Sequence, residues 1–311
     1  MLAVECLPKT HVIQSMAEII DDDESTNLKS SEQMIDNKHH SISAIKIPLA
    51  SSQPILAISS NYILANESTN KRKRLILIDQ HFQRYPMNCP ITQDIIDALW
   101  YDAEQKFFLL TERKIFTFDP NTKDIEPISD IRSNDRKPFK CFTVFNNQSS
   151  LLIAYDEWGP KFIDRWQKTN ENNRWTLNRR HSLNLTSNEF IGIILGINQD
   201  DCFNLAITIY NSLTQEWRME LRQLETLICF KKILLPGSDY IHDYRIIAMN
   251  NVTLDIKWLI HSPATNKVIA IDFQWNIIPL RYTVPVYRII QFKENNLILR
   301  TKKRIDIHSF N

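Results

Sequence analysis

The apolar residues of the chain gather in short runs from residue 42 onward. These runs are rich in Ile, Leu, Val, Phe and Tyr, and Asn, Asp, Ser, Pro and clusters of charged residues separate them. Apolar runs of about 4 to 8 residues with β-branched and aromatic side chains are typical of β-strands. The pattern therefore predicts an all-β domain over residues 42–311.

The expected strands recur as a unit of apolar strands joined by short turns, and the third strand often ends in an acid. In the clearest copy, strands are expected at 96–101, 106–111, 114–119 and 124–128. The other copies place strands at 54–59, 62–66 and 75–79; at 140–145, 151–155, 161–166 and 174–182; at 190–197, 203–210, 217–224 and 227–234; at 243–249, 253–261, 268–272 and 277–282; and at 286–292, 296–300 and 304–308.

This repeat predicts a β-propeller. Six units in about 270 residues give about 45 residues each, which is within the range for propeller blades. The last unit has only three strands, and residues 42–47 form a spare strand at the other end of the domain. An N-terminal strand that completes the last sheet would close the ring and remove an open edge. We expect six four-stranded antiparallel sheets, with seven as the alternative because the units between 167 and 240 are less regular.

Three of the third strands end in the pairs Ile78-Asp79, Phe118-Asp119 and Ile271-Asp272. At these ends the chain resembles the WD40-like propellers, whose third strand typically ends in Trp-Asp. No Trp precedes these Asp residues, and the Gly-His pair that opens the family's repeats is absent. The resemblance implies a rigid platform on which other proteins assemble. The carboxylate of Asp119 is also expected to accept a backbone N–H two residues on and so to stabilise its turn.

Glycine is scarce, with four in 311 residues. A phosphate-binding loop needs several Gly so that backbone N–H groups can approach the ligand. Gly192 and Gly196 make a GxxxG spacing, but no Lys-Ser or Lys-Thr follows them, and a GxSxG nucleophile elbow is absent. These facts argue against nucleotide-binding loops. We expect Asn and Asp to fill the left-handed turn positions, since they tolerate positive φ better than other non-Gly residues.

The cysteines and histidines give no sign of a metal or cofactor site. Five Cys lie far apart without a CxxC pair, and eight His are scattered, so no cofactor and no metal are expected.

The net charge of +1 provides no overall field toward nucleic acid or an anionic membrane. No signal-peptide pattern or long apolar span occurs. The composition predicts a cytoplasmic or nuclear protein that does not bind membranes.

Residues 1–41 differ from the rest of the chain. A short helix is expected at 11–20, and the acidic run Asp21-Asp22-Asp23-Glu24 and a long polar stretch follow it. So little apolar surface cannot offset the entropy of ordering, which predicts a flexible acidic and polar arm. The helix would be a partner-docking peptide or, as the simpler alternative, a transient helix or a cap on the domain.

Two segments are candidate partner contacts. The basic run Lys71, Arg72, Lys73 and Arg74 is expected in a hairpin, where it would be an import signal, a contact for phosphate or acidic peptide, or simply solvated charge. The turn Tyr155, Asp156, Glu157 and Trp158 offers aromatic anchors, although its Trp would more simply pack on the neighbouring blade.

The sequence predicts a non-catalytic platform for protein–protein interaction, with other proteins as partners and nucleic acid not expected. The alternative is a metal-dependent six-bladed hydrolase or lactonase with acids of the inner strands gathered on the axis. Asp97 and Glu189 are the candidate carboxylates for it, although a divalent ion needs several oxygen ligands together.

Overall fold

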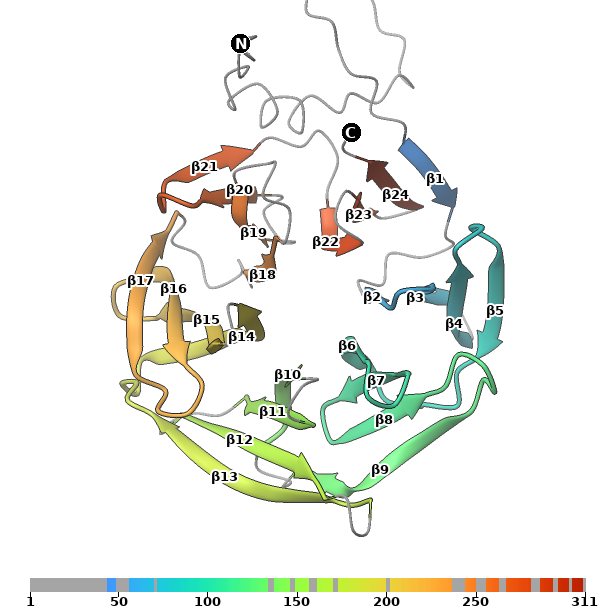
Figure 1. Ribbon diagram of the computed structural model, residues 1–311, viewed down its shortest axis with the longest axis horizontal. Coiled ribbons are helices and arrows are strands. Elements are labelled where there is room, and N and C mark those ends of the chain that lie inside the picture. The colour runs from blue at the N-terminus through green and yellow to red at the C-terminus, as the bar shows by residue number, and fades with distance from the viewer. Residues whose placement is uncertain are drawn as a thin grey trace, which may run out of the picture.

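A computed structural model describes residues 44–48, 56–69, 72–133, 137–145, 149–156, 161–169, 173–199, 202–236, 244–249, 256–262, 267–280, 286–292, 296–301 and 304–309. These residues form six four-stranded antiparallel sheets, and the sheets stand around a central axis as the blades of a propeller (Figure 1). The expected all-β propeller is confirmed, with six blades. No helix that could cross a membrane is found in the part of the chain described.

The first three blades follow the order of the sequence, with the first strand of each sheet nearest the axis. Blade 1 contains β2 (Leu56–Ile58), β3 (Tyr62–Thr69), β4 (Arg72–Asp79) and β5 (Arg84–Asn88); blade 2 contains β6 (Ile95–Tyr101), β7 (Lys106–Thr111), β8 (Lys114–Phe118) and β9 (Ile125–Arg132); blade 3 contains β10 (Phe139–Phe145), β11 (Ser150–Tyr155), β12 (Lys161–Lys168) and β13 (Trp175–Leu183).

The next two blades repeat this arrangement, and the last one takes a strand from the beginning of the domain. Blade 4 contains β14 (Glu189–Gln199), β15 (Cys202–Asn211), β16 (Glu216–Gln223) and β17 (Cys229–Leu235); blade 5 contains β18 (Arg245–Ala248), β19 (Ile256–Ser262), β20 (Lys267–Asp272) and β21 (Ile277–Leu280); blade 6 contains β22 (Val286–Phe292), β23 (Asn296–Thr301), β24 (Arg304–Ser309) and β1 (Ala44–Pro48).

The ring is closed by pairing of its two ends. β1 lies antiparallel to β24, in a register that runs from Ala44 opposite His308 to Pro48 opposite Arg304. The N-terminal strand therefore becomes the outer strand of blade 6, as the sequence predicts. The expected arm at 1–41 and its helix at 11–20 lie outside the described residues and stay predictions.

The middle strands of the blades are buried on both faces, because each sheet packs between two neighbouring sheets. All six residues of β11 are buried, as are five of the six in β7. Burial on both faces explains why these strands read as continuous apolar runs rather than as an alternation of apolar and polar residues. The core is therefore a series of apolar layers between blades.

The aspartates that end third strands stabilise the turns that follow them. Oδ1 of Asp119 accepts the backbone N–H of Asn121 at 2.9 Å, which confirms the expected interaction. Asp79 accepts the N–H of His81 at 2.8 Å in the same way. In blade 5, Asp272 accepts the N–H of Asn276 at 2.7 Å. The repeated acid therefore has a local structural role in these three blades.

The expectation that Asn and Asp fill the left-handed turn positions is wrong. Of the described non-Gly residues with positive φ, only Asn173 is of either type, and the others are Phe82, Gln105, Lys123, Ser149, Gln215, Leu227 and Trp275. The Asp side chain instead begins the turn, where it accepts backbone N–H groups, and the left-handed residue comes at the end of the turn. The N–H of Phe82 thus bonds to the carbonyl of Asp79 at 3.0 Å.

Candidate functional site

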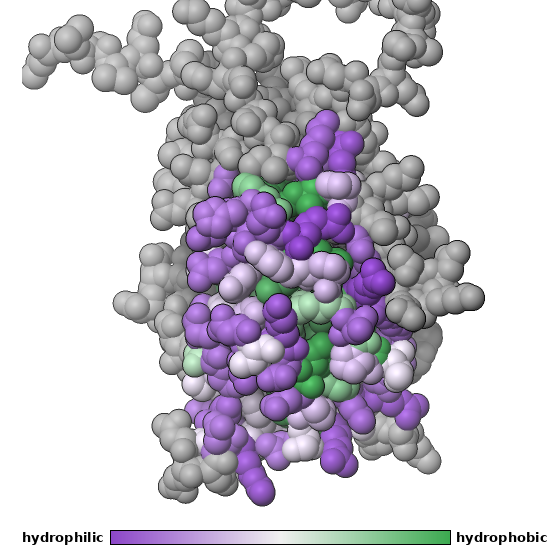
Figure 2. Space-filling model, turned by 90° about the vertical axis from the view of Figure 1, so that its right-hand side faces the viewer, coloured by the Kyte–Doolittle hydropathy of each residue, from purple (hydrophilic) through white to green (hydrophobic). Residues whose placement is uncertain are grey.

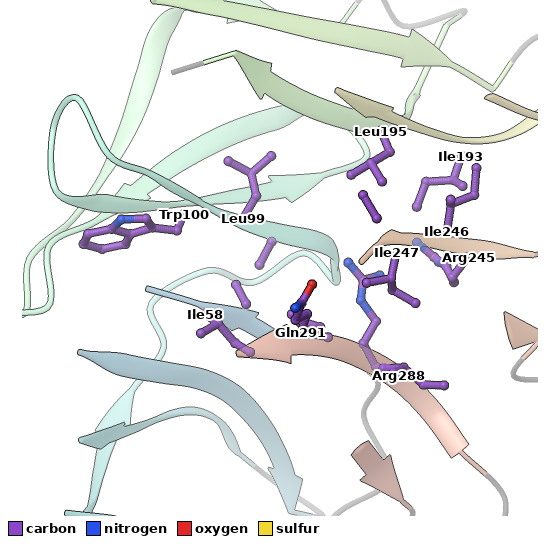
Figure 3. Close-up of a pocket in the computed structure, with 15 residues that line it drawn as sticks. Ile58, Leu99, Trp100, Ile193, Leu195, Arg245, Ile246, Ile247, Arg288 and Gln291 are labelled. Atoms are coloured by element: carbon purple, nitrogen blue, oxygen red, sulfur yellow. The ribbon is translucent and has the colours of Figure 1, made fainter. Parts of the chain in front are cut away.

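A cavity of about 490 Å³ lies on the axis of the ring, where the inner strands converge. Five of the six inner strands contribute side chains to its wall (Figure 3). Most of these side chains are aliphatic, and they include Ile58, Leu99, Ile193, Leu195, Ile246, Ile247, Ile289 and Ile290. The polar members of the wall are Arg245, Arg288 and Gln291. The cavity therefore combines an apolar wall with a small number of polar groups, as ligand sites commonly do.

Arg288 on β22 reaches a carboxylate of another blade. Its Nη2 donates to Oδ1 of Asp97 on β6 at 2.9 Å, and the side chains of Arg288 and Asp97 are only 17% and 6% exposed. The register of each strand shifts just before these residues, between Val286 and Arg288 in one and between Ile95 and Asp97 in the other. A β-bulge changes the direction of the following side chain. The two bulges thus lie next to the residues that form the pair.

The carboxylates proposed for a metal centre are each held by an arginine. Asp97 pairs with Arg288, and Oε1 of Glu189 lies 2.5 Å from Nη1 of Arg218. Glu189 also accepts the backbone N–H of Thr186 at 2.8 Å. No group of three His, Cys, Asp or Glu side chains placed to hold a metal ion is found among the residues that the structure describes. A cation bound by Asp97 would have to compete with the guanidinium of Arg288.

The first residue of the candidate turn at 155–158 belongs to a buried network. The hydroxyl of Tyr155 donates to Oδ2 of Asp164 at 2.7 Å, and Arg180 donates to both oxygens of Asp164 at 2.7 Å. Burial, followed by the hydrogen bond to Asp164, raises the pKa of Tyr155. Asp156 is exposed beside it, whereas Glu157 and Trp158 lie outside the described residues. Tyr155 itself contributes support for this turn rather than contact surface.

The basic run is part of a strand, because β4 already begins at Arg72. Lys73 lies 2.5 Å from Oδ1 of Asp94 and donates to the carbonyl of Thr92 at 3.0 Å. Arg74 is half-buried, and its backbone faces that of Glu67 in β3. Lys71 and the side chain of Arg72 lie outside the described residues. The ammonium of Lys73 is thus engaged within the fold.

The outer strand of blade 4 carries an apolar surface that we call the blade 4 rim. It consists of Ile228, Phe230 and Leu234, which are 65%, 55% and 59% exposed. Phe230 and Leu234 belong to β17, and Ile228 directly precedes the strand. With Leu213 in the turn between β15 and β16, blade 4 holds half of the large apolar side chains that are exposed in the described part of the chain. The alternation is visible in the sequence, but its exposure follows only from the arrangement of the blades.

One exposed cation lies within the blade 4 rim, next to the partly buried Lys231. Lys232 is 64% exposed, and its Nζ is 3.7 Å from Oε1 of the buried Glu220. Arg218 and Arg222 also donate to Glu220, Arg218 Nε at 2.7 Å and Arg222 Nε at 2.8 Å. Burial alone raises the pKa of Glu220, but the hydrogen bonds and charges of these arginines outweigh it and lower the pKa. The surface of the rim is therefore apolar with one exposed positive charge.

The other outer strands carry residues that discourage pairing with another chain. Proline and charged side chains are common means of protecting a sheet edge. Four outer strands contain a proline, and these residues are Pro48, Pro86, Pro127 and Pro279. In β13 the residues Arg179 and Arg180 are exposed instead. β17 has the exposed Lys232 and a β-bulge near Cys229, but it has no proline and also exposes two large apolar side chains within the strand.

The opposite side of the ring has a different surface. Figure 2 shows the side that carries β4 and β5, where hydrophilic residues cover most of the described surface and apolar residues appear only in small areas between them. Tyr85 on β5 is 41% exposed, but its hydroxyl bonds to Asp79 at 3.0 Å. The concentration of exposed apolar side chains is thus a property of blade 4 and not of the whole circumference.

Comparison with known proteins gives similarity only at the level of the fold. No protein family model matches the sequence, and no curated protein matches it. The virginiamycin B lyase of Staphylococcus aureus has a TM-score of 0.58 at 9% identity, with 87% of this chain and 100% of the lyase covered. The WD40 domain of Toxoplasma gondii coronin has a TM-score of 0.56 at 8% identity, with 86% of each chain covered.

A chain of the mitotic checkpoint complex is also similar, with a TM-score of 0.56 at 5% identity and 93% of this chain and 99% of that chain covered. The similar structures thus include an enzyme as well as a WD40 domain. Together with the six sheets of the ring, these likenesses confirm the fold expected from the WD40-like resemblance: the chain is a six-bladed β-propeller.

Proposed function

We propose that this propeller is a non-catalytic protein-interaction platform and that its partner adds a β-strand to the outer edge of β17. The blade 4 rim is the observation that carries this proposal. Two apolar side chains of an edge strand and one directly before it remain more than half exposed. Exposed apolar patches of this kind, surrounded by polar residues, are typical of interaction sites.

The geometry of β17 defines the chemistry of the partner. Strand addition supplies main-chain hydrogen bonds, and alternate side chains supply specificity. The partner segment would be extended, with apolar residues beside Phe230 and Leu234. An acidic residue beside Lys232 would compete with Glu220 for the exposed ammonium. The partner is therefore a protein with an exposed strand of alternating apolar residues and one acid.

The rest of the ring would hold this edge in place. β17 pairs along its inner side with β16, and its buried residues Ile233 and Leu235 belong to the apolar core around blade 4. Lys231 lies over the ring of Trp275 in blade 5 at 4.9 Å from the centroid. An edge that is already rigid loses little entropy on binding. The WD40 domain and the chain of the mitotic checkpoint complex, which belongs to a protein assembly, support this proposal at the level of the fold.

The test is affinity purification of the tagged full chain from native lysate, with quantitative comparison of variants. The rim variant Ile228→Thr/Phe230→Thr/Leu234→Thr introduces residues of high β-propensity and removes the apolar surface. We expect it to lose a stoichiometric partner that the wild-type chain retains.

The matched control is Leu177→Thr/Phe273→Thr/Ile277→Thr, which changes three exposed apolar residues of blades 3 and 5. It should retain the partner at the wild-type level, and both variants should melt at similar temperatures. Equal retention by the rim variant, or the absence of a stoichiometric partner of the wild-type chain, would contradict the proposal.

A further inference from the structure

We infer that the axial cavity is a binding site for a small uncharged aliphatic molecule, of which a medium-chain alcohol is the simplest example. This inference is independent of the partner proposed for the blade 4 rim. It rests on the volume of the cavity, on the aliphatic side chains of its wall and on the interactions that its polar side chains already make within the protein.

The size and rigidity of the cavity suit a small molecule. Its volume of about 490 Å³ is within the range of about 300 to 1,000 Å³ that is usual for ligand pockets. The wall comes from inner strands of five blades, so five separate sheets fix its shape. A cavity formed in this way exists before the ligand binds, which reduces the ordering cost of binding.

The wall favours an aliphatic ligand. Isoleucine, leucine or alanine side chains face the cavity from each of the strands β2, β6, β14, β18 and β22 (Figure 3). A water molecule is held in a cavity by two to four polar partners, and an aliphatic wall provides few of them. An aliphatic ligand would remove its own apolar surface and that of the wall from water at the same time, which is favourable.

The polar side chains of the wall are already engaged within the protein. Arg288 donates to Asp97 at 2.9 Å, and Arg245 and Gln291 also interact with other groups of the protein. An uncharged aliphatic ligand leaves these interactions in place, whereas a charged or polyhydroxylated ligand would have to compete for them. Because polar groups without a partner are costly in an apolar surrounding, the cavity favours a ligand without charge and with few hydrogen-bonding groups.

The first experiment is isothermal titration calorimetry of the purified full chain with 1-hexanol, 1-heptanol and 1-octanol. We expect each alcohol to bind with a stoichiometry of one. Each added methylene group should tighten binding by about fourfold, because it buries further apolar surface against the wall. Absence of octanol binding, or an affinity that does not rise along the series, would overturn the inference.

The second experiment tests the preference for an uncharged ligand. Sodium octanoate and octylammonium chloride have the same aliphatic chain as octanol but carry opposite charges at neutral pH. We expect both to bind at least about tenfold more weakly than octanol, because a charge is costly to bury in an apolar surrounding. An affinity for either ion equal to that for octanol would overturn the assignment to an uncharged ligand.

The third experiment locates the site. Ala248 lines the cavity and is half-buried, so Ala248→Trp would fill part of the cavity. Ala103 lies exposed in a turn of blade 2, so Ala103→Trp is the control with the same added bulk. We expect Ala248→Trp to abolish octanol binding and Ala103→Trp to leave it unchanged. Undiminished binding to a folded Ala248→Trp variant would overturn the assignment to the cavity.

A second pair of variants tests the same assignment without added bulk. Leu99 lines the cavity and is half-buried, so Leu99→Asn replaces part of the aliphatic wall with an amide. Leu177 is exposed on β13, so Leu177→Asn is the same change outside the cavity. Leu99→Asn should weaken octanol binding by about tenfold, and Leu177→Asn should leave it unchanged. Equal affinity of the two variants for octanol would contradict the role of the aliphatic wall.

Discussion

Arg288 on β22 and Asp97 on β6 form an ion pair at 2.9 Å although 191 positions separate them in the sequence. The pair joins blade 6 to blade 2, and blade 1 stands between these two in the ring (Figure 1). It therefore connects two blades that are not neighbours in the ring and do not pack face to face. The link lies on the axis, where each blade contributes its inner strand.

Loss of one partner of this pair should destabilise the ring. Arg288→Leu would leave the nearly buried carboxylate of Asp97 without this cation, and breaking a buried pair in this way typically costs about 3 to 5 kcal/mol. The double variant Arg288→Leu/Asp97→Leu should recover much of this loss. Urea denaturation of the wild-type chain and the two variants measures both effects, and a double variant no more stable than Arg288→Leu would contradict the proposed coupling.

Gly192 is required by close contacts within blade 4. A Cβ atom at this position would lie 2.5 Å from Oγ1 of Thr208 and 2.8 Å from Cζ3 of Trp217. Oγ1 of Thr208 accepts the N–H of Ile193 at 2.9 Å and donates to the carbonyl of Tyr244 at 3.3 Å, next to blade 5.

Gly192→Ala should therefore lower the free energy of unfolding by about 1 to 3 kcal/mol, as is usual when a packed core is overfilled. Thr214→Ala, in an exposed turn of the same blade, is the control and should change stability by less than about 0.5 kcal/mol. Denaturant titration measures the free energy of unfolding of both variants. A Gly192→Ala variant as stable as the control would refute the steric argument.

Several turns of the ring contain strained residues that a glycine would relieve. Gln215 has a φ of 57° and is exposed, so its side chain has a steric cost without a packing role. Gln215→Gly should stabilise the protein by about 1 kcal/mol, because the left-handed conformation disfavours residues with a Cβ by about that amount. Thr214→Gly, one residue earlier and not among the residues with positive φ, should not stabilise it. Thermal melts of both variants provide the comparison.

His181 should make stability depend on pH. It is 5% exposed on β13, near Arg179, Arg165, Asp164 and Glu225. Burial, and then the charges of Arg179 and Arg165, lower its pKa below the usual value. In the unfolded chain the imidazole takes up a proton near pH 6.5, whereas in the folded ring it does so only at a lower pH.

Acidification from pH 7 through this window therefore favours the unfolded state, and stability is lost as pH falls below about 6.5. His181→Gln should reduce the difference in unfolding free energy between pH 7 and pH 5. Urea midpoints at both pH values give this difference, and an unchanged difference in the variant would exclude His181 as the titrating group.

The sequence predicted the blades well where both faces of a strand are buried. Between their first and last residues β7, β11 and β20 are entirely apolar, because a neighbouring blade covers each side of them. It missed β5 (Arg84–Asn88), which is exposed at most positions and contains Pro86, so neither apolar content nor propensity marks it as a strand. Outer strands have little core to bury, and their sequences are correspondingly less constrained.

The candidate sites were harder to predict for two physical reasons. The pair of Arg288 and Asp97 depends on bulges in two strands and on the closure of the ring, and neither is visible in local periodicity. The alternation of Ile228, Phe230 and Leu234 is present in the sequence, but only the packing of the blades shows that no described element covers these side chains. Tyr155 likewise suggested a surface contact, and its place in a buried network follows from the position of Asp164 on β12.

The most direct test of the proposed function is amide hydrogen exchange of the propeller with and without its captured partner. If the partner adds a strand to β17, exchange should slow in peptides that cover Cys229–Leu235 and stay unchanged in β5, β9 and β21, whose prolines protect those edges. A bound partner that leaves exchange in Cys229–Leu235 unchanged would contradict the account.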